Sequence, residues 1–171
     1  MNSKKLLSFA LLPLVLAPAL RAVEVSPILL QVKEEGGGKW SHQGETQEKS
    51  LSIELTNTSA QNVSVKVKYY FFDKDVKGKE VAIFKDGEKS ATVKAHATST
   101  IQTEKVTAKS NEKHAETPKK GRNGSIQAGK EVPASGQRLV GYGVQVRQDG
   151  KVLADCFSEP SLKTFVGGGD R

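Results

Sequence analysis

The sequence has 171 residues, with 26 lysines and arginines against 19 aspartates and glutamates, which gives a formal net charge of +7. This length suits one β-sandwich and is too short for two ordinary domains once a leader is removed. One cysteine excludes an internal disulfide, so core packing alone must hold the fold. The positive charge is interleaved with acids, which favours a solvated surface over a dedicated site for anionic lipids, glycans or nucleic acid.

The first segment of the chain has the pattern of a signal peptide. Two lysines precede an apolar run over residues 6–16 that is too short to span a bilayer comfortably. Small residues allow cleavage after Ala19 or after Ala22, so the leader is expected to cover residues 1–22. A retained anchor helix is the alternative, disfavoured by two prolines in the run and by the charges that close it. We therefore expect an exported protein, in the periplasm, at the cell surface or outside the cell.

Several short segments of alternating polarity predict β-strands. In residues 63–69 every second side chain is apolar and the others are polar, which is typical of a half-buried antiparallel strand. Residues 51–56 alternate in the same way and precede a turn-like connection. Pro27 lacks a backbone donor, so the first strand is expected at a sheet edge. Further strands are expected at 23–32, 80–84, 90–95, 99–106, 139–147 and 152–157.

These segments and the lack of helical periodicity predict an all-β fold. We expect one immunoglobulin-like antiparallel β-sandwich of about seven or eight strands, with two long loops, over residues 23–166. Residues 167–171 are expected to be a flexible C-terminal tail. Oligomers remain open because exposed strand edges can join copies of the chain.

Two stretches have no strand pattern and are expected to be the long loops. Residues 33–49 contain three consecutive glycines and Trp40, which is either a contact residue or docked on the protein's own core. Residues 108–137 are polar and basic, and long loops of this kind are commonly mobile, disordered or functional. The basic side chains there that could meet an anionic partner are Lys109, Lys113, Lys119, Lys120 and Arg122.

Asp-Gly pairs at 86–87 and 149–150 are hairpin signals, and the second predicts a hairpin between the last two strands. A two-residue turn would place Val144 opposite Asp155 and bury a carboxylate among valines. A three-residue loop with a bulge would instead pair Val144 with Ala154 and turn Asp155 outward. We expect this bulged register, with Cys156 a small core residue instead of a reactive or intermolecular thiol.

The same register turns Leu153 and Phe157 to the opposite face of the last strand. An apolar pair there needs cover, either from a partner or from the residues that follow. Leu162, Phe165 and Val166 could provide it. Leu153 and Phe157 therefore join Trp40 and the basic residues as the candidate interaction surface.

No arrangement of residues in the sequence points to catalysis or to a bound metal. His42, His96 and His114 lie in separate segments without ligand spacing. Asp73 and Asp75 flank a turn but fall short of the oxygen ligands of a calcium loop. Nucleophile-elbow, P-loop and dinucleotide-binding motifs are missing. We expect no enzyme activity, no cofactor and no metal.

The strand at 141–146, Gly-Tyr-Gly-Val-Gln-Val, resembles the Tyr-x-Val-x-Val strand of fibronectin type III and related immunoglobulin-like domains. Tyr142 is the position matching their corner tyrosine. The antibody-type cysteine pair and central-strand tryptophan are missing, which leaves the subfamily open. The chain from its leader through GYGVQVRQDGK to FSEPSL also resembles small exported immunoglobulin-like proteins encoded beside type IV pilus genes in gut mucin-dwelling bacteria.

That resemblance implies a cell-surface or pilus-associated protein with a role in adhesion or host contact, and it carries over no binding residue. The first hypothesis is thus a non-enzymatic exported interaction protein with a protein partner. The alternative is a periplasmic or secreted binder of anionic glycans, host or mucin glycans included, that uses the basic loop. Nucleic acid is not an expected partner, and the mature chain is not expected to contain a transmembrane segment.

Overall fold

The computed structural model describes residues 26–41, 44–115, 119–120, 126–127, 129 and 131–166. The predicted signal peptide and the predicted C-terminal tail lie outside these residues. The eight long strands are β1 (Ile28–Ser41), β2 (Gly44–Asn57), β3 (Val63–Asp75), β4 (Val81–Val93), β5 (Thr98–Gln102), β6 (Val106–Asn111), β11 (Ser135–Gln148) and β12 (Lys151–Phe157). Short pairs of residues form β7 (His114–Ala115), β8 (Lys119–Lys120), β9 (Ile126–Gln127) and β10 (Glu131–Val132), and a 3-10 helix, η1 (Pro160–Phe165), follows β12.

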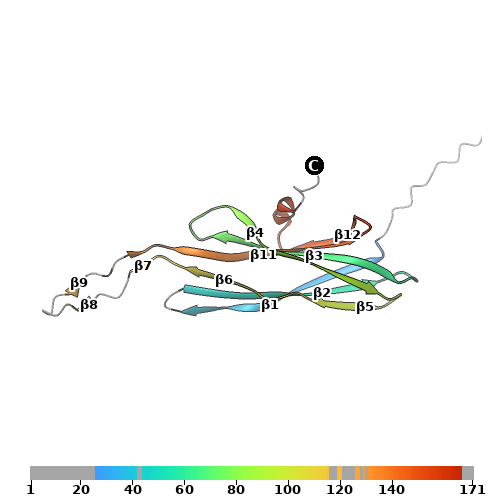
Figure 1. Ribbon diagram of the computed structural model, residues 1–171, viewed down its shortest axis with the longest axis horizontal. Helices are drawn as coiled ribbons and strands as arrows, with labels where there is room; N and C mark the ends of the chain where they lie inside the picture. Colours follow the sequence, from blue (N-terminus) through green and yellow to red (C-terminus); the bar gives the residue numbers. More distant parts are fainter. Residues whose placement is uncertain are drawn as a thin grey trace, which may run out of the picture.

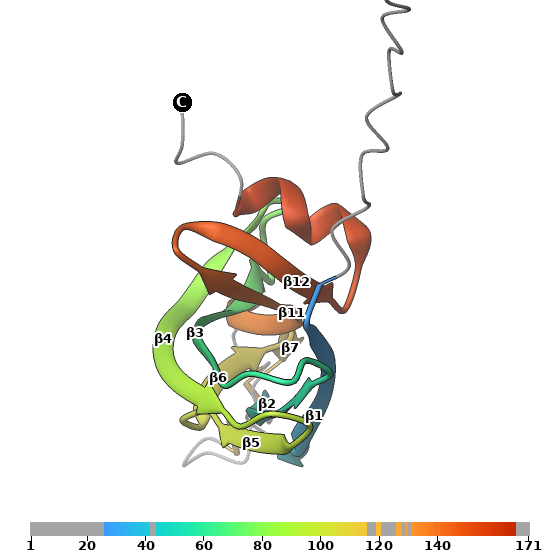
Figure 2. The same cartoon turned by 90° about the vertical axis from the view of Figure 1, so that its right-hand side faces the viewer.

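The long strands form two facing layers (Figure 1). Layer A contains β1, β2, β5 and β6, and layer B contains β3, β4, β11 and β12, with antiparallel pairing throughout. The N-terminal end of β11 pairs with β6 through Ser135 and Gly136, so this strand connects the two layers. The view along the strands in Figure 2 separates the layers clearly. The structure confirms the expected all-β sandwich.

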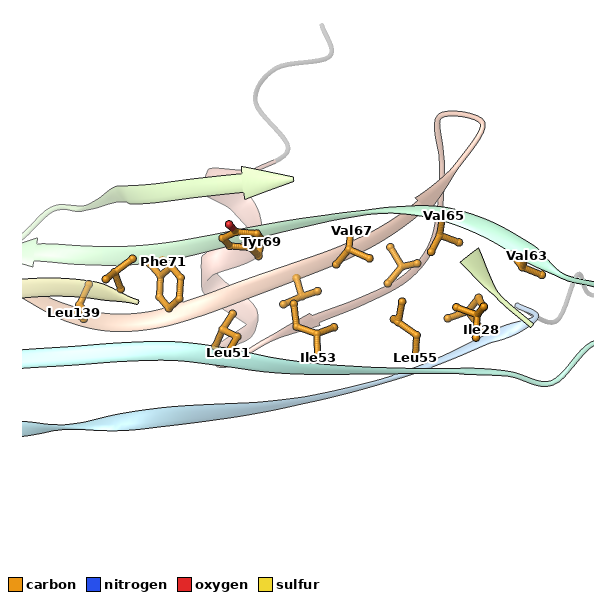
Figure 3. Close-up of a cluster of buried hydrophobic side chains, with 14 of the residues drawn as sticks. Ile28, Leu51, Ile53, Leu55, Val63, Val65, Val67, Tyr69, Phe71 and Leu139 are labelled. Carbon is orange, nitrogen blue, oxygen red and sulfur yellow. The ribbon is translucent and has the colours of Figure 1, made fainter. Parts of the chain in front are cut away.

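The core fills the space between the layers (Figure 3). Alternate residues of β3, from Val63 to Phe71, point inward and are buried, and Leu51, Ile53 and Leu55 of β2 meet them. The alternation predicted for residues 51–56 and 63–69 is therefore confirmed. Fully burying one such aliphatic side chain stabilises the fold by about 1.5–3 kcal/mol, which is how the sandwich holds without a disulfide.

Residues 33–49, expected to be a loop, instead continue β1 and β2 as a long hairpin. Its ladder runs from the pair of Ile28 with Asn57 to the pair of Ser41 with Gly44. The side chains of β1 are exposed from Glu34 onward. A strand whose two faces both meet solvent has no reason to alternate in polarity, so its sequence carries no strand pattern. As Pro27 indicated, β1 is an edge strand.

The second expected loop, residues 108–137, is also partly strand. β6 continues to Asn111 along β2, and β11 begins at Ser135. Beyond them β7 pairs with β10, and β8 pairs with β9 farther from the sandwich (Figure 1). Each of these four short strands contains only two residues, which is too few for an alternation of polar and apolar side chains to show in the sequence.

β4 passes straight through the Asp-Gly pair at 86–87, where the sequence indicated a turn. Tyr69 of β3 lies directly opposite Gly87. A Cβ atom on residue 87 would collide with the tyrosine hydroxyl and ring. Glycine is therefore present to admit Tyr69, and the hairpin signal was wrong.

β11 and β12 meet at a two-residue turn, so the three-residue loop expected here is wrong. Asp149 and Gly150 have φ values of 48° and 83°, and they lie between the paired residues Gln148 and Lys151. Left-handed backbone at both positions is the type I′ geometry that Asp-Gly favours in two-residue hairpins.

The expected bulge exists, but it lies within β12 at Leu153. The extra residue shifts the register, so Val144 pairs with Cys156 and not with Ala154. Val144 is fully buried and Asp155 is exposed, as the sequence analysis required. The physical argument against burying the carboxylate was sound, while the position of the bulge was not predictable from it.

Helix η1 covers part of the outer face of layer B. Leu162 is buried against Tyr70 and Phe72, and Phe157 packs against the same cluster. The rings of Phe165 and Phe72 lie with their centroids 6.2 Å apart. The cover expected from the C-terminal residues is thus found for Phe157, which shares this cluster with Leu162 and Val166, but not for Leu153. Within the described residues, no helix is long and apolar enough to cross a membrane.

Candidate functional site

Trp40 lies near the end of the β1–β2 hairpin and is 64% exposed, so it does not dock on the core. The Arg138 guanidinium lies over the indole ring, with 5.9 Å between its Cζ atom and the ring centroid. This is the geometry of a cation–π contact. The aromatic ring therefore has one side against a fixed cation and remains open to solvent elsewhere.

Arg138 is held by two acids that come from different strands and segments. Its Nε atom is 3.2 Å from Glu45 Oε2, and its Nη2 atom donates a 3.3 Å hydrogen bond to Glu112 Oε1. The Nε and Oε2 atoms are buried and attract each other as an ion pair, although they are not aligned as a hydrogen bond. Gln47 donates to Glu45 Oε1 and accepts from the backbone N–H of Leu139. The network ties the guanidinium to both layers.

The strand register separates Trp40 from the basic residue Lys109. Trp40 pairs with Glu45, which pairs with Ser110, whereas Lys109 pairs with Thr46. Neighbouring residues of a strand point to opposite faces, so Lys109 is on the outer face of layer A and Trp40 is on the other. The two residues share an end of the molecule but not a surface.

The other basic residues of the candidate surface are Lys113, Lys119, Lys120 and Arg122. Lys113 forms a 2.9 Å ion pair with Glu131 that is largely exposed to solvent. The backbones of Lys119 and Lys120 pair with Gln127 and Ile126 in the β8–β9 ladder. Arg122 lies outside the described residues.

Leu153 and Phe157, expected on one face, belong to two different clusters. The bulge at Leu153 lets its half-buried side chain pack against the main core. Phe157 keeps the predicted position opposite Gly143 and packs with Tyr70 and Phe72. Neither residue is left as part of an open apolar patch.

Sequence reasoning missed Arg138, Glu45 and Glu112, which define the surroundings of Trp40. These residues are far apart in the chain, and each looks like an ordinary solvated charge. The contact depends on the register of β1 with β2 and on the crossing of β11 to β6, which local patterns do not encode. We call the surface formed by Trp40, Arg138, Glu45 and Glu112 the tryptophan platform.

Reactive groups are sparse in the described part of the chain. Burial, with a smaller contribution from Asp155, raises the pKa of the half-buried Cys156 thiol above its ordinary value. A raised pKa keeps the thiol protonated at neutral pH, which disfavours nucleophilic chemistry. No group of three or more histidine, cysteine, aspartate or glutamate side chains in the described ranges could hold a metal ion.

Comparisons with known proteins find little. No protein-family model and no curated protein matches the sequence. A target of the Northeast Structural Genomics Consortium, known from an X-ray structure, is 12% identical, with 81% of this chain and 91% of that chain covered and a TM-score of 0.38. A protein from Akkermansia muciniphila, known from a crystal structure, is 14% identical, with 77% and 71% covered and a TM-score of 0.30. Scores this low carry no argument, so function must be argued from the geometry.

Proposed function

We propose that this chain is a non-enzymatic interaction module of an exported protein, and that it binds a protein partner through the tryptophan platform. The observation that carries the proposal is Trp40, 64% exposed and in contact with Arg138. Tryptophan and arginine are the residues most enriched among those that dominate interface energies. An exposed tryptophan offers a partner a large apolar area together with an N–H donor, which is why tryptophan is enriched at interfaces.

The surroundings of Trp40 also favour binding. Glu45 and Glu112 fix the guanidinium of Arg138, which in turn limits the orientations open to the indole. A side chain that is already ordered loses little conformational entropy when a partner binds. The platform is therefore prepared for contact before the partner arrives.

The proposed location is the cell surface, with a type IV pilus as the first place to look for the partner. The predicted leader supports export, and the resemblance to exported proteins encoded beside pilus genes supports the pilus. A role in adhesion or host contact would follow if the partner is a pilus or host protein.

Site-specific crosslinking in the source cells tests this proposal. A photoreactive phenylalanine analogue at position 40 should capture one exported protein. The matched control places the same analogue at Leu29, which is 56% exposed at the other end of the same strand. Capture from position 40 alone, with the chain in the cell-envelope or secreted fraction, is the expected result.

Affinity measurements with the purified partner complete the test. Trp40→Ala should weaken binding by about 2 kcal/mol or more, roughly thirtyfold, whereas Leu29→Ala should leave it nearly unchanged. Equal capture from both positions, an unchanged affinity for Trp40→Ala, or a chain confined to the cytoplasm would each overturn the proposal.

A further inference from the structure

A second surface lies on the outer face of layer B, on the part of β3 that η1 does not cover. A shallow hollow of about 650 Å³ crosses β3, β4 and β11 and ends at the turn between β11 and β12. We call it the β3 trough. The side chains that carry the argument are Ser64, Lys66, Lys68, Ser90, Thr92 and Arg147.

The trough concentrates positive charge in an unusual way. Lys66 of β3 pairs directly with Arg147 of β11, so two cations lie side by side on one face. Lys68 follows two residues along the same strand and points the same way. Like charges directly opposite each other destabilise a sheet, and a protein without use for them would be expected to avoid the pair.

The acids near the trough compensate only part of this charge. Glu88 forms a 3.4 Å ion pair with Lys66, in which both side chains are well exposed. Asp149 lines the end of the trough at the turn, and Asp155 is paired with Lys163 instead. Glu88 also lies directly opposite Lys68 in the β3–β4 ladder, so this one carboxylate faces two cations, and among the described residues Arg147 forms no ion pair.

Arg147 is the most informative of these groups because it is half-buried. Its Nη2 atom donates a 2.9 Å hydrogen bond to Gln145 Oε1, which is a neutral acceptor. Its buried Nε atom has no hydrogen-bond partner in the described part of the chain. A guanidinium that is partly removed from water lacks a counter-ion here, and an oxyanion in the trough would supply the opposite charge.

The other lining groups indicate the kind of ligand. The hydroxyls of Ser64 and Thr92 lie 3.0 Å apart beside the cations, and Ser90 pairs with Lys66 on the other side. Aromatic side chains are missing from the lining, which disfavours single-stranded nucleic acid because bases stack on aromatic rings. The apolar side chains of the lining are Val65, which is buried, and Ala91, so the lining offers no large exposed apolar side chain to anchor a folded protein.

We propose that the β3 trough binds a sulfated glycan chain, with its sulfate groups on Lys66, Lys68 and Arg147 and its hydroxyls on the serine and threonine side chains. Charge complementarity and the hydroxyl-bearing lining of the open trough carry this inference. It goes beyond the tryptophan platform and uses none of its residues, so either proposal can fail without the other. It places anionic-glycan binding on a sheet face, whereas the sequence had suggested the basic loop at residues 108–137.

Calorimetric titration of the full mature protein with a heparin-derived oligosaccharide tests the site. Replacing Lys66 and Arg147 together by glutamine should reduce affinity by about tenfold or more, since bonds to charged groups are lost. The matched control, Lys33→Gln with Lys94→Gln, removes the same charge from exposed positions outside the trough and should change affinity by less than about twofold.

Two further measurements sharpen the result. The oligosaccharide should raise the melting temperature of the parent protein and not that of the Lys66 and Arg147 double variant, whose own unfolding curve shows that it is folded. The desulfated oligosaccharide should bind at least about tenfold more weakly than the sulfated one.

Several outcomes would overturn the proposal. Equal losses of affinity in the two double variants would mean that the net charge of the protein alone attracts the oligosaccharide. Equal binding of the desulfated oligosaccharide, or of a single-stranded DNA oligomer, would mean that sulfate is not what is recognised. If the parent protein showed no detectable binding of the sulfated oligosaccharide, the proposed site would be ruled out.

Discussion

Gly143 of β11 and Phe157 of β12 are paired across the terminal hairpin, and the phenylalanine ring occupies the space where a side chain on residue 143 would begin. A Cβ atom there would lie 2.4 Å from the ring. Gly143→Ala must therefore displace Phe157 from the cluster under η1. We expect a loss of about 1–3 kcal/mol in the free energy of unfolding.

Urea unfolding measures this loss, and Gly37→Ala is the control. Residue 37 also lies within a strand, but nothing is within 4 Å of the position its Cβ would take. Its variant should stay within about 0.5 kcal/mol of the parent protein. Similar unfolding curves for the two variants would show that Phe157 does not depend on the absence of a side chain at 143.

Asn57 should be among the least replaceable polar residues. It is 1% exposed, and its Nδ2 group donates to three backbone carbonyls, those of Gln61, Val93 and Lys94. Asn57→Ala removes this donor from the buried carbonyl of Val93 and the part-buried carbonyl of Gln61, which should cost about 2–4 kcal/mol. Thermal unfolding followed by circular dichroism measures the change. Thr58→Ala, which removes one exposed hydrogen bond, should cost less than about 1 kcal/mol by the same assay.

Asp73 should make the fold less stable as the pH rises. Burial raises the pKa of its carboxyl above the ordinary value of 3.8. The folded state then binds more protons than the unfolded state between the ordinary pKa and the raised one, so stability falls as pH increases through that range. Above it, the charged carboxylate carries a desolvation cost that its backbone hydrogen bond offsets only in part.

Asp73→Asn removes this cost, and it should raise stability at pH 7 while flattening the fall above pH 3.8. Urea midpoints measured across this range provide the test. Asp86→Asn, which neutralises an exposed carboxylate on β4, should keep the pH dependence of the parent protein. A parallel pH profile for the Asp73 variant would contradict the assigned burial effect.

The chain has one tryptophan, so its fluorescence reports on the tryptophan platform alone. Removing the guanidinium by Arg138→Ala should expose the covered side of the indole and increase quenching by acrylamide. Lys109→Ala, which removes a charge from the other face of layer A, should leave quenching unchanged. Equal quenching of the parent protein and the Arg138 variant would show that the stacked arrangement is not populated.

The sequence predicted the parts of the fold in which one strand face is buried. Val65 and Val67 alternate with polar residues because they face the core, and this alternation revealed β3. Residues 36–41 are equally regular as strand, but they bury nothing and so carry no signal. Backbone pairing with β2 alone holds this extension together. Such pairing depends on the partner strand, so the sequence of residues 36–41 does not reveal it.

The candidate site was less predictable than the fold. Trp40 was identified because a lone tryptophan in a segment without strand pattern is a candidate contact residue, although its exposure became clear only from the structure. Arg138 and Arg147 were not, since their meaning depends on which residues lie opposite them across two strands. The alternation of Val144 and Val146 places Arg147 on the outer face, but the residues opposite it on β3 and β12 depend on the pairing of distant strands, which local sequence does not show.

The pairing of β11 with both layers also has a mechanical meaning. A pulling force along β11, applied at Ser135, would put the hydrogen-bond ladders with β3 and β12 under shear. The two residues paired with β6 would transfer part of the force to layer A. Hydrogen bonds loaded in this direction must break together and cannot open one at a time. A chain that has to hold its partner against flow would gain resistance to tearing from this one crossing strand.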